Sequence, residues 1–182
     1  MDIILSILSL PVFFVALFVV SIVQYRTIGV FFVQPRIGLN GDLFNIYKFK
    51  TMTSSNNKMV LNTKGVVKRK DDLRITKFGK FLRTYSIDEI PQIFNILKGK
   101  MSWVGPRPIV KIEFDNLSEI EKRRTNVKPG ITGLAQINGR DALDIKTLTK
   151  YDLEYIEKYS LLLDLDILIK SVKVVLEKKN NY

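Results

Sequence analysis

Residues 3–23 read IILSILSLPVFFVALFVVSIV, and these 21 positions contain no charged side chain. As a straight helix the stretch would measure about 32 Å, which is enough to cross the hydrocarbon core of a bilayer. A helix buried in a soluble core is the alternative, which a run apolar on every face disfavours. The stretch therefore predicts a helix inserted in a membrane, with the rest of the chain attached to it.

Two geometries remain open for this helix: a simple span, and a re-entrant helix that returns to the side it entered. Cleavage as a signal peptide is disfavoured, because no basic region precedes the run and no small-x-small pattern ends it. Pro11 removes one backbone hydrogen bond and kinks a helix, and the hydroxyls of Ser6 and Ser9 could satisfy freed carbonyls. Arg26 and the basic residues beyond it favour a cytoplasmic position for the chain on the C-terminal side of the helix.

Composition limits the chemistry of the remaining chain. The 182 residues fit one domain plus attachments, and 29 Lys and Arg against 18 Asp and Glu give a net charge of +11. Such a balance indicates polyanionic partners: nucleic acid, anionic lipid or phosphorylated substrates. Cysteine and histidine are both absent, which excludes disulfides, thiol nucleophiles and metal sites built on these residues. Catalysis would fall to carboxylates, lysine, tyrosine or hydroxyl groups.

The local patterns predict an α+β chain. Two strands are expected at residues 30–34 and 43–50, joined by a turn at Gly38-Leu39-Asn40-Gly41. A helix should begin near Ser86 or Asp88 and run to Lys98, with Ile87, Ile90, Phe94 and Leu97 as its apolar face. Further helices are expected over about 118–124, where Ser118 and Glu121 fit a capping box, and over most of 146–178. Residues 53–72 are polar and irregular, and their basic cluster (Lys64 and 68–70) fits a solvated loop.

Asp88 and Glu89 lie in the most informative stretch, residues 83–91, and two compatible interpretations apply to them. Ser86 and Glu89 have the spacing of a capping box, and acidic residues suit a helix N-terminus. Adjacent carboxylates at a helix start can also bind a divalent cation and face a phosphate.

Two interpretations also apply to several cationic residues. Lys48 and Lys50 share one face of the second strand, and Arg36 lies at the end of the first. They are either ordinary solvated side chains or a phosphate clamp. Arg107 stands between Pro106 and Pro108, either as part of a turn or as a guanidinium preorganised for bidentate phosphate recognition.

Together these pieces resemble the bacterial monotopic phosphoglycosyl transferases in their short form. The matching motifs are, in order, residues 34–38 (QPRIG), 48–52 (KFKTM), 82–92 (LRTYSIDEIPQ), 94–99 (FNILKG), 101–108 (MSWVGPRP), 128–133 (KPGITG) and 136–140 (QINGR). The resemblance covers nearly the whole chain. It departs at Leu10, where the family usually has Ser before Pro11, at Lys100, which is often Asp, and at Leu134, which is often Trp.

By this resemblance Asp88 is the nucleophile that attacks the sugar-bearing phosphate of a nucleotide diphosphate sugar, expected to be a UDP-sugar. The resulting sugar-phosphoryl aspartate is then attacked by polyprenyl (undecaprenyl) phosphate. An aspartate of ordinary pKa, about 3.9, needs no histidine to ionise it at neutral pH. Mg²⁺, Arg83 and Lys48 would offset the repulsion between carboxylate and diphosphate.

Other roles in the site are expected on the same basis. Glu89 either binds the metal with Asp88 or accepts a proton from the acceptor phosphate. Arg36, Lys50, Arg107 and Arg140 are candidates for phosphate or nucleotide contacts, in a loop held by Pro106 and Pro108.

The resemblance also implies an organisation and partners. Residues 1–26 are expected to form a re-entrant membrane helix, broken at Pro11 and Ser9, and 27–182 a catalytic domain at the cytoplasmic face of the bacterial inner membrane. The acceptor phosphate lies at the membrane interface, so Asp88 and Glu89, called the dyad below, must lie there too. Partners are then the donor, the acceptor, phospholipids and downstream glycosyltransferases, with no nucleic acid.

Two rivals from other classes compete with this hypothesis. The +11 charge also fits a membrane-tethered binder of nucleic acid or anionic lipid, but no helix-turn-helix or RNP-like pattern is seen. A non-catalytic membrane scaffold of the same fold is the other, and the intact Asp88-Glu89 pair argues against it.

Overall fold

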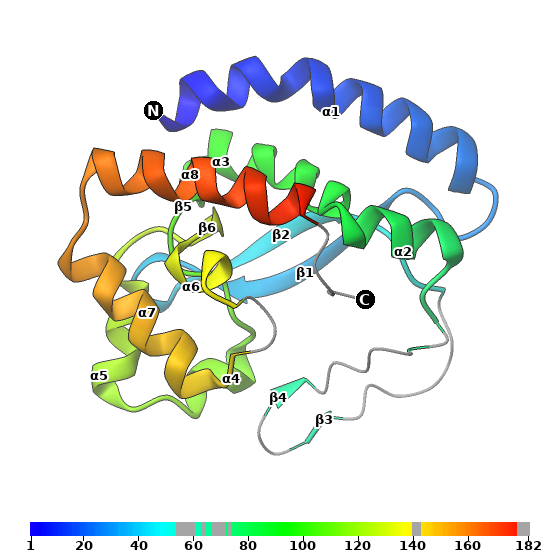
Figure 1. The fold of residues 1–182 in the computed structure, drawn as a ribbon. Helices are drawn as coiled ribbons and strands as arrows, with labels where there is room; N and C mark the ends of the chain where they lie inside the picture. Colours follow the sequence, from blue (N-terminus) through cyan, green and yellow to red (C-terminus); the bar gives the residue numbers. More distant parts are fainter. Residues whose placement is uncertain (54–60, 63–64, 67–71, 73, 140–142, 178–182) are drawn as a thin grey trace.

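The computed structural model describes residues 1–53, 61–62, 65–66, 72, 74–139 and 143–177. The chain is α+β, as expected (Figure 1). Its helices are α1 (Asp2–Gln24), α2 (Lys77–Thr84), α3 (Ile93–Leu97), α4 (Lys111–Asp115), α5 (Glu119–Lys122), α6 (Leu134–Ile137), α7 (Ile145–Glu157) and α8 (Leu161–Leu176). Short 3-10 turns are η1 (Leu39–Gly41), η2 (Ile87–Gln92) and η3 (Arg123–Asn126). The strands are β1 (Phe31–Ile37), β2 (Leu43–Phe49), β3 (Leu61–Asn62), β4 (Gly65–Val66), β5 (Ser102–Val104) and β6 (Gly130–Thr132).

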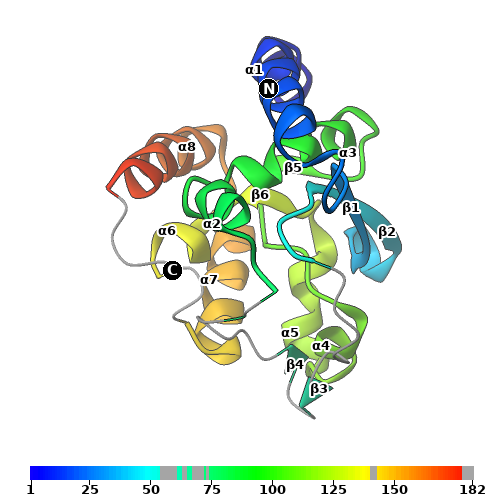
Figure 2. The same ribbon diagram turned by 90° about the vertical axis from the view of Figure 1, so that its right-hand side faces the viewer.

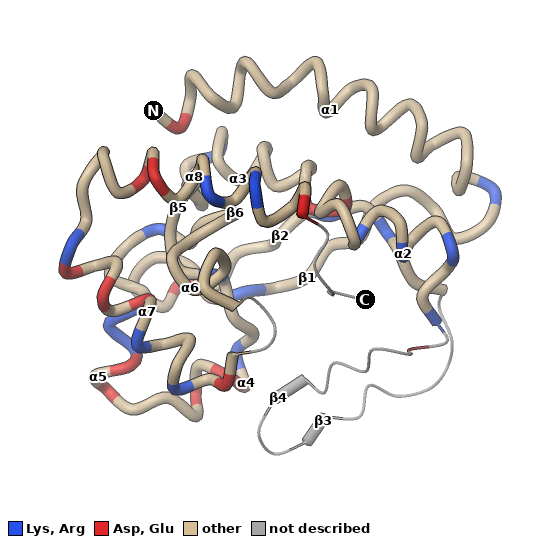
Figure 3. The backbone as a smooth tube through the Cα atoms, viewed as in Figure 1, with Lys and Arg blue, Asp and Glu red and all other residues tan. Residues whose placement is uncertain are grey.

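Helix α1 lies across the top of the molecule as one arched helix, and both views place the hairpin and α3 below it (Figures 1 and 2). Its length and composition would allow it to cross a membrane. Only one narrow face is buried, at Ser6, Phe13, Val20 and Gln24, and the apolar residues around that face are exposed. The backbone tube of α1 carries no Lys or Arg, whereas basic residues are spread through the body below (Figure 3).

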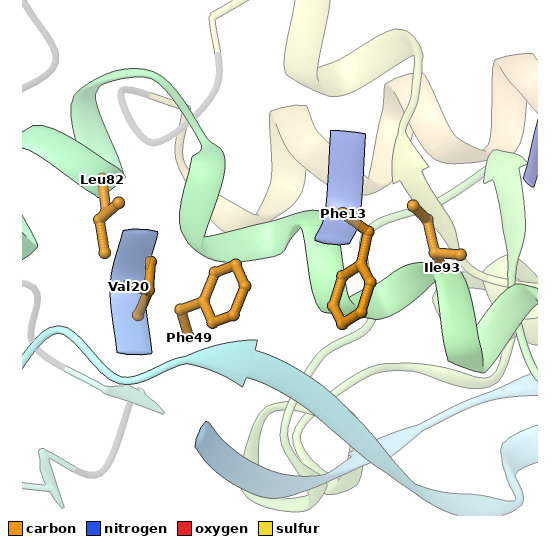
Figure 4. Close-up of a cluster of buried hydrophobic side chains, with 5 residues drawn as sticks. All are labelled: Phe13, Val20, Phe49, Leu82 and Ile93. Atoms are coloured by element: carbon orange, nitrogen blue, oxygen red, sulfur yellow. The ribbon is translucent and has the colours of Figure 1, made fainter. Parts of the chain in front are cut away.

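The buried face of α1 completes the main hydrophobic core. Phe13 and Val20 pack with Phe49, Leu82 and Ile93, which come from β2, α2 and α3 (Figure 4). The Phe13 ring stacks on Phe49 with centroids 6.2 Å apart. The predicted membrane segment is therefore also part of the folded core, because it supplies two of its central side chains.

Hydrogen bonds fix both ends of α1 to the same body. At its start, Asp2 Oδ1 accepts from Ser102 Oγ at 3.0 Å and from Trp103 N at 3.3 Å. At its end, Gln24 Nε2 donates to the carbonyl of Lys50 at 2.8 Å. The first contact ties the helix to β5 and the second to the residue after β2, so α1 spans the body from one side to the other.

Pro11 lies inside α1 and does not end it. The carbonyl that Pro11 leaves without its usual donor is that of Ile7, four residues earlier. Ser9 Oγ does donate to a helix carbonyl, but to that of Ser6, at 2.8 Å. The expected hydroxyl-to-backbone bond thus exists one position away from the freed carbonyl. How this helix sits in a bilayer, re-entrant or spanning, stays a prediction.

The predicted hairpin is confirmed. Strands β1 and β2 pair antiparallel from Phe31 opposite Phe49 to Ile37 opposite Leu43. The connection uses Asn40 and Gly41 with φ of 55° and 82°, which the Asn-Gly pair accepts readily. The first strand runs beyond the predicted residue 34 and through Pro35, which is tolerated because β1 is an edge strand.

The single helix predicted from Ser86 to Lys98 is wrong in detail. The segment forms η2 and then α3, and α2 before it was not predicted. Ser86 adopts a left-handed conformation with φ of 56°, and its side chain makes no capping bond. The capping-box interpretation is therefore wrong, which frees Glu89 for other contacts. Ile87, Ile90 and Phe94 do face the core, whereas Leu97 is exposed.

The two glycine- and proline-rich loops of the sequence meet through the parallel pair of β5 and β6. Gly130 lies so close to Gly105 that a Cβ atom on Gly130 would collide with the backbone nitrogen of Gly105. The predicted capping box of Ser118 and Glu121 is confirmed at α5. In the last helix, α8, Ile167 is buried while Leu161, Leu162 and Ile169 are exposed.

Gly79→Ala should lower the thermal stability of the protein strongly. A Cβ atom at Gly79 would collide with the carbonyl of Thr51, against which α2 packs. Overpacking of this kind costs about 1–3 kcal/mol, and more where backbone must move. The measurement is thermal unfolding in detergent, with Lys80→Ala on the exposed side of α2 as the matched control. Equal melting temperatures for the two variants would contradict this packing of α2 on Thr51.

Candidate active site

The Asp88-Glu89 pair lies on η2, which packs along β2 beneath α1. Asn95 of α3 fixes this arrangement, because its side chain accepts from Tyr47 N at 3.1 Å and donates to the carbonyl of Asn45 at 2.7 Å. Both contacts use the β2 edge that β1 does not occupy. The pair is thereby held beside Lys48.

Glu89 is clamped between two cations. Lys48 Nζ donates to Glu89 Oε1 at 2.6 Å, and Arg107 Nη2 donates to the same oxygen at 2.9 Å. The Glu89 side chain is 13% exposed. Burial alone would raise the pKa of Glu89, but Arg107 and Lys48 outweigh it and hold that pKa well below its usual range. Glu89 is therefore an ionised carboxylate that joins β2 to the loop of Arg107.

Asp88 has a different environment although it is the next residue. It is 8% exposed and makes no ion pair with the described residues. Burial, and secondly the charge of Glu89, raise the pKa of Asp88 to about 6. This pKa lies above the ordinary value of about 3.9 that the sequence alone suggests. At pH 7 Asp88 is still mostly ionised, and Lys48, Arg83 and Arg107 favour that form electrostatically.

Arg83 reaches the site from the last turn of α2. Its Nε donates to Thr51 Oγ1 at 2.9 Å, and its charge acts on Asp88. Sequence reasoning found Arg83 but missed Thr51, whose hydroxyl orients the guanidinium. Thr51 lies in the KFKTM motif, and that motif is the sequence signal that could have identified it.

Arg36 lies behind Arg107 and supports its loop. Arg36 Nη2 donates to Gln34 Oε1 at 2.9 Å, and Nη1 to the carbonyl of Pro108 at 3.4 Å. Burial, together with the charge of Arg107, lowers the pKa of Arg36 to about 10. Pro106 and Pro108, on either side of Arg107, are both buried.

The structure gives less information about where the other predicted cations lie. The backbone of Lys50 bonds Val30 and Gln24, and the pleat puts its side chain on the face of Lys48. Arg140 and the basic cluster of Lys64 and 68–70 lie outside the described residues.

A buried ion pair that the sequence did not reveal supports the backbone of Arg107. Arg124 Nη2 lies 2.6 Å from Asp152 Oδ2, and both side chains are 2% exposed. The same nitrogen donates to the carbonyl of Arg107 at 2.9 Å. Arg124 therefore couples α7 to the backbone of the residue that clamps Glu89. Its place in a charged segment, typical of a solvated helix, concealed this role.

The carboxylates offer a limited but suitable set of metal ligands. Among the residues that the structure describes, no group of three Asp, Glu, His or Cys side chains comes together. Mg²⁺ commonly takes one or two carboxylates and completes its shell with substrate phosphates and water. Asp88 fits that requirement, whereas the Oε1 atom of Glu89 already accepts from two cations.

The site is a carboxylate pair surrounded by cations, as suits a transferase that handles phosphates, and it lies beneath a helix long and apolar enough to cross a membrane. Residues 1–178 match the family described as bacterial sugar transferase. The chain belongs to this family and is a sugar transferase, so the expected enzyme class and relationship are confirmed.

Individual relatives support the same class. The sugar transferase EpsL of Bacillus subtilis is 44% identical over 164 residues, which are 89% of this chain and 78% of EpsL. The galactosyl transferase CpsE of Streptococcus agalactiae is 42% identical over 89% of this chain and 38% of CpsE. A UDP-glucose:undecaprenyl-phosphate glucose-1-phosphate transferase of Xanthomonas campestris is 42% identical over 84% of this chain and 33% of its own length. The chain thus spans most of EpsL but only a third to two fifths of the two longer relatives.

Asp88 is expected to titrate with a midpoint near 6 in chelator-treated protein. The raised pKa means that the carboxylate is protonated below that pH and ionised above it. Carbon-13 NMR of labelled aspartate side chains measures the midpoint, and Asp88→Asn assigns the signal. Glu89→Gln should move the midpoint down, because it removes a neighbouring negative charge. An Asp88 midpoint near 4, the ordinary value, would contradict this description of the site.

Proposed function

We propose that this chain is a phosphoglycosyl transferase that moves a sugar-1-phosphate from a UDP-sugar to undecaprenyl phosphate, through a covalent intermediate on Asp88. The observation that carries the proposal is the contrast within the dyad. Asp88 is buried and has no ion pair with the described residues, beside a Glu89 neutralised by Lys48 and Arg107. The name of the Xanthomonas relative supports the donor and acceptor.

In the first step an Asp88 carboxylate oxygen attacks the phosphorus that carries the sugar. A new aspartyl O–P bond forms, the bond from that phosphorus to the bridging oxygen breaks, and uridine monophosphate leaves with the electron pair. Arg83, Lys48 and Arg107 lie where they would neutralise the diphosphate as the carboxylate approaches. A bound Mg²⁺, held by Asp88 together with the phosphates, would supply further charge neutralisation.

In the second step an oxygen of undecaprenyl phosphate attacks the same phosphorus and releases the Asp88 carboxylate. The product is an undecaprenyl diphosphate sugar. The acceptor is a phosphate whose second pKa is about 6 by analogy with monoesters, so much of it is already deprotonated at neutral pH. It therefore requires little help from a base.

This mechanism gives Glu89 a positioning role. A carboxylate whose pKa is held well below its usual range accepts protons poorly. Instead, Lys48 and Arg107 both contact the Oε1 atom of Glu89, which holds the two cations close together. We infer that Glu89 aligns these two cations for the phosphates, in preference to serving as a general base.

The membrane arrangement is inferred from the attachments of α1. Its first turn is bonded to Ser102 and Trp103, and its last residue to Lys50, all of one body. A spanning helix would place these ends on opposite sides of a bilayer about 30 Å thick. The contacts therefore support a re-entrant helix with both ends at the cytoplasmic face of the inner membrane. The site under α1 would then lie at the depth of the acceptor phosphate.

Asp88→Asn should abolish the covalent intermediate. An amide is a poor nucleophile toward phosphorus and carries no charge, so no radiolabelled sugar-phosphoryl protein should form from a UDP-sugar labelled in the sugar. Labelled protein is measured after denaturing electrophoresis. An adduct on the Asn variant would refute the assignment of the nucleophile.

Glu89→Gln serves as the comparison in the same assay. It keeps the Asp88 nucleophile but loosens Lys48 and Arg107, so an adduct should still form, at least tenfold more slowly, if the clamp contributes about 1.4 kcal/mol or more. Near-native rates would remove Glu89 from the mechanism.

The ends of α1 should be accessible from one side only. Because the chain has no cysteine, a cysteine in a tag fused before Met1 gives an unambiguous label, with Lys158→Cys directly after α7 as the control. Both should react with a membrane-impermeant maleimide only after intact cells are opened. Labelling of the tag from the periplasm, with Lys158→Cys protected, would show that α1 spans.

A further inference from the structure

Strand β1 presents an aromatic ring beside the dyad. Phe32 is directly opposite Lys48 in the hairpin register. Side chains of directly opposed residues lie on one face of a sheet, with Cβ atoms about 4.5–5.5 Å apart. The Lys48 ammonium is bonded to Glu89 at 2.6 Å. Phe32 therefore lies one cross-strand step from the lysine that reaches the dyad.

This face of the hairpin is not the face that α1 covers. Successive residues of a strand point to opposite faces, so Phe31 and Phe49 belong to the other face. Phe49 contacts Phe13 of α1 there, and Phe31 stacks on Phe49 with centroids 5.8 Å apart. Phe32 is nevertheless 40% exposed. The Phe32 ring is therefore partly open to solvent on the face of the hairpin that carries Lys48.

The next residues on the Phe32 face are polar, and they lie opposite Ile46 and Phe44 of β2. They are Gln34 and then Arg36, two and four positions along β1. Gln34 uses its amide oxygen to accept from Arg36 at 2.9 Å, and its NH₂ group has no partner among the described residues. Phe32 and the NH₂ group of Gln34 thus lie on the face of the hairpin that carries Lys48, where a ring could stack on a base and an amide could bond a base carbonyl or a ribose hydroxyl.

We infer that Phe32 is the stacking platform for the nucleobase of the donor. The inference rests on the proposed function, which supplies a uridine nucleotide, and adds the subsite that holds its base. Every base has a π-face, and one base stacked on an aromatic side chain strengthens binding by roughly ten- to a hundredfold. The base would lie on Phe32 while the diphosphate extends past Lys48 to Asp88, and the NH₂ group of Gln34 faces a base carbonyl or ribose hydroxyl.

Equilibrium binding of radiolabelled uridine monophosphate to the full chain in nanodiscs tests this subsite. Phe32→Ala should weaken binding about tenfold or more, and Phe32→Trp should stay within about threefold of the unmodified protein. Phe31→Ala is the matched control, since it removes an equally large ring, 49% exposed, from the opposite face. It should leave binding unchanged. Ribose 5-phosphate, which lacks the base, should bind Phe32→Ala and the unmodified protein equally.

Kinetics give a second readout. With a UDP-sugar that the unmodified protein turns over, Phe32→Ala should raise the donor KM by a similar factor and leave the undecaprenyl phosphate KM unchanged. A rise confined to the acceptor KM would show that Phe32 faces lipid and would overturn the inference. So would unchanged nucleotide binding by Phe32→Ala, or an equal loss for ribose 5-phosphate, which would indicate a general disturbance of the site.

The outcomes separate this inference from the proposed function. If the unmodified protein forms undecaprenyl diphosphate sugar and Phe32→Ala binds the nucleotide normally, only the platform is wrong. If the nucleotide binds in a Phe32-dependent way but no UDP-sugar is turned over, the transfer reaction is wrong and the subsite stands. If the unmodified protein does not bind uridine monophosphate, both are overturned.

Discussion

The ionic contact of Glu89 with Lys48 and Arg107 organises the site, because it joins three segments that are distant in sequence. Lys48 comes from the hairpin, Glu89 from η2, and Arg107 from the loop after β5. Buried charges are costly unless they are paired, so none of the three segments can take this arrangement without the others. The neighbouring Asp88 gains its raised pKa from the same burial while it stays outside the clamp.

The clamp in turn depends on packing farther away. Arg36 and Arg124 both bond backbone carbonyls of the proline loop, at Pro108 and Arg107. Arg124 is itself held by Asp152 of α7. The guanidinium of Arg107 thus faces Glu89 from a loop that is anchored on two sides. This rigidity suits a site that must keep cations at fixed places while a phosphoryl group is transferred.

Much of this could be predicted from the sequence, for reasons that differ between elements. The hairpin was predictable because an Asn-Gly turn and alternating strands are local signals. The dyad and its cations were found because the motifs that contain them are contiguous. The helical conformation of residues 86–98 was not, because Ser86 adopts a left-handed conformation that the capping pattern does not indicate. The Arg124–Asp152 pair, the Thr51 contact and the raised pKa of Asp88 all depend on burial between distant segments, which no local pattern encodes.

Helix α1 does more than attach the protein to a surface. Phe13 and Val20 fill the core against Phe49, the residue next to Lys48, and against Leu82, the residue next to Arg83. Part of the protein's interior is thus built from a helix whose outer side is apolar and exposed. The lipid or detergent around α1 therefore affects the structure of the enzyme. A detergent that loosens α1 also loosens the packing of the residues next to Lys48 and Arg83. A version that lacks this helix would lose part of its hydrophobic core, not only an attachment segment.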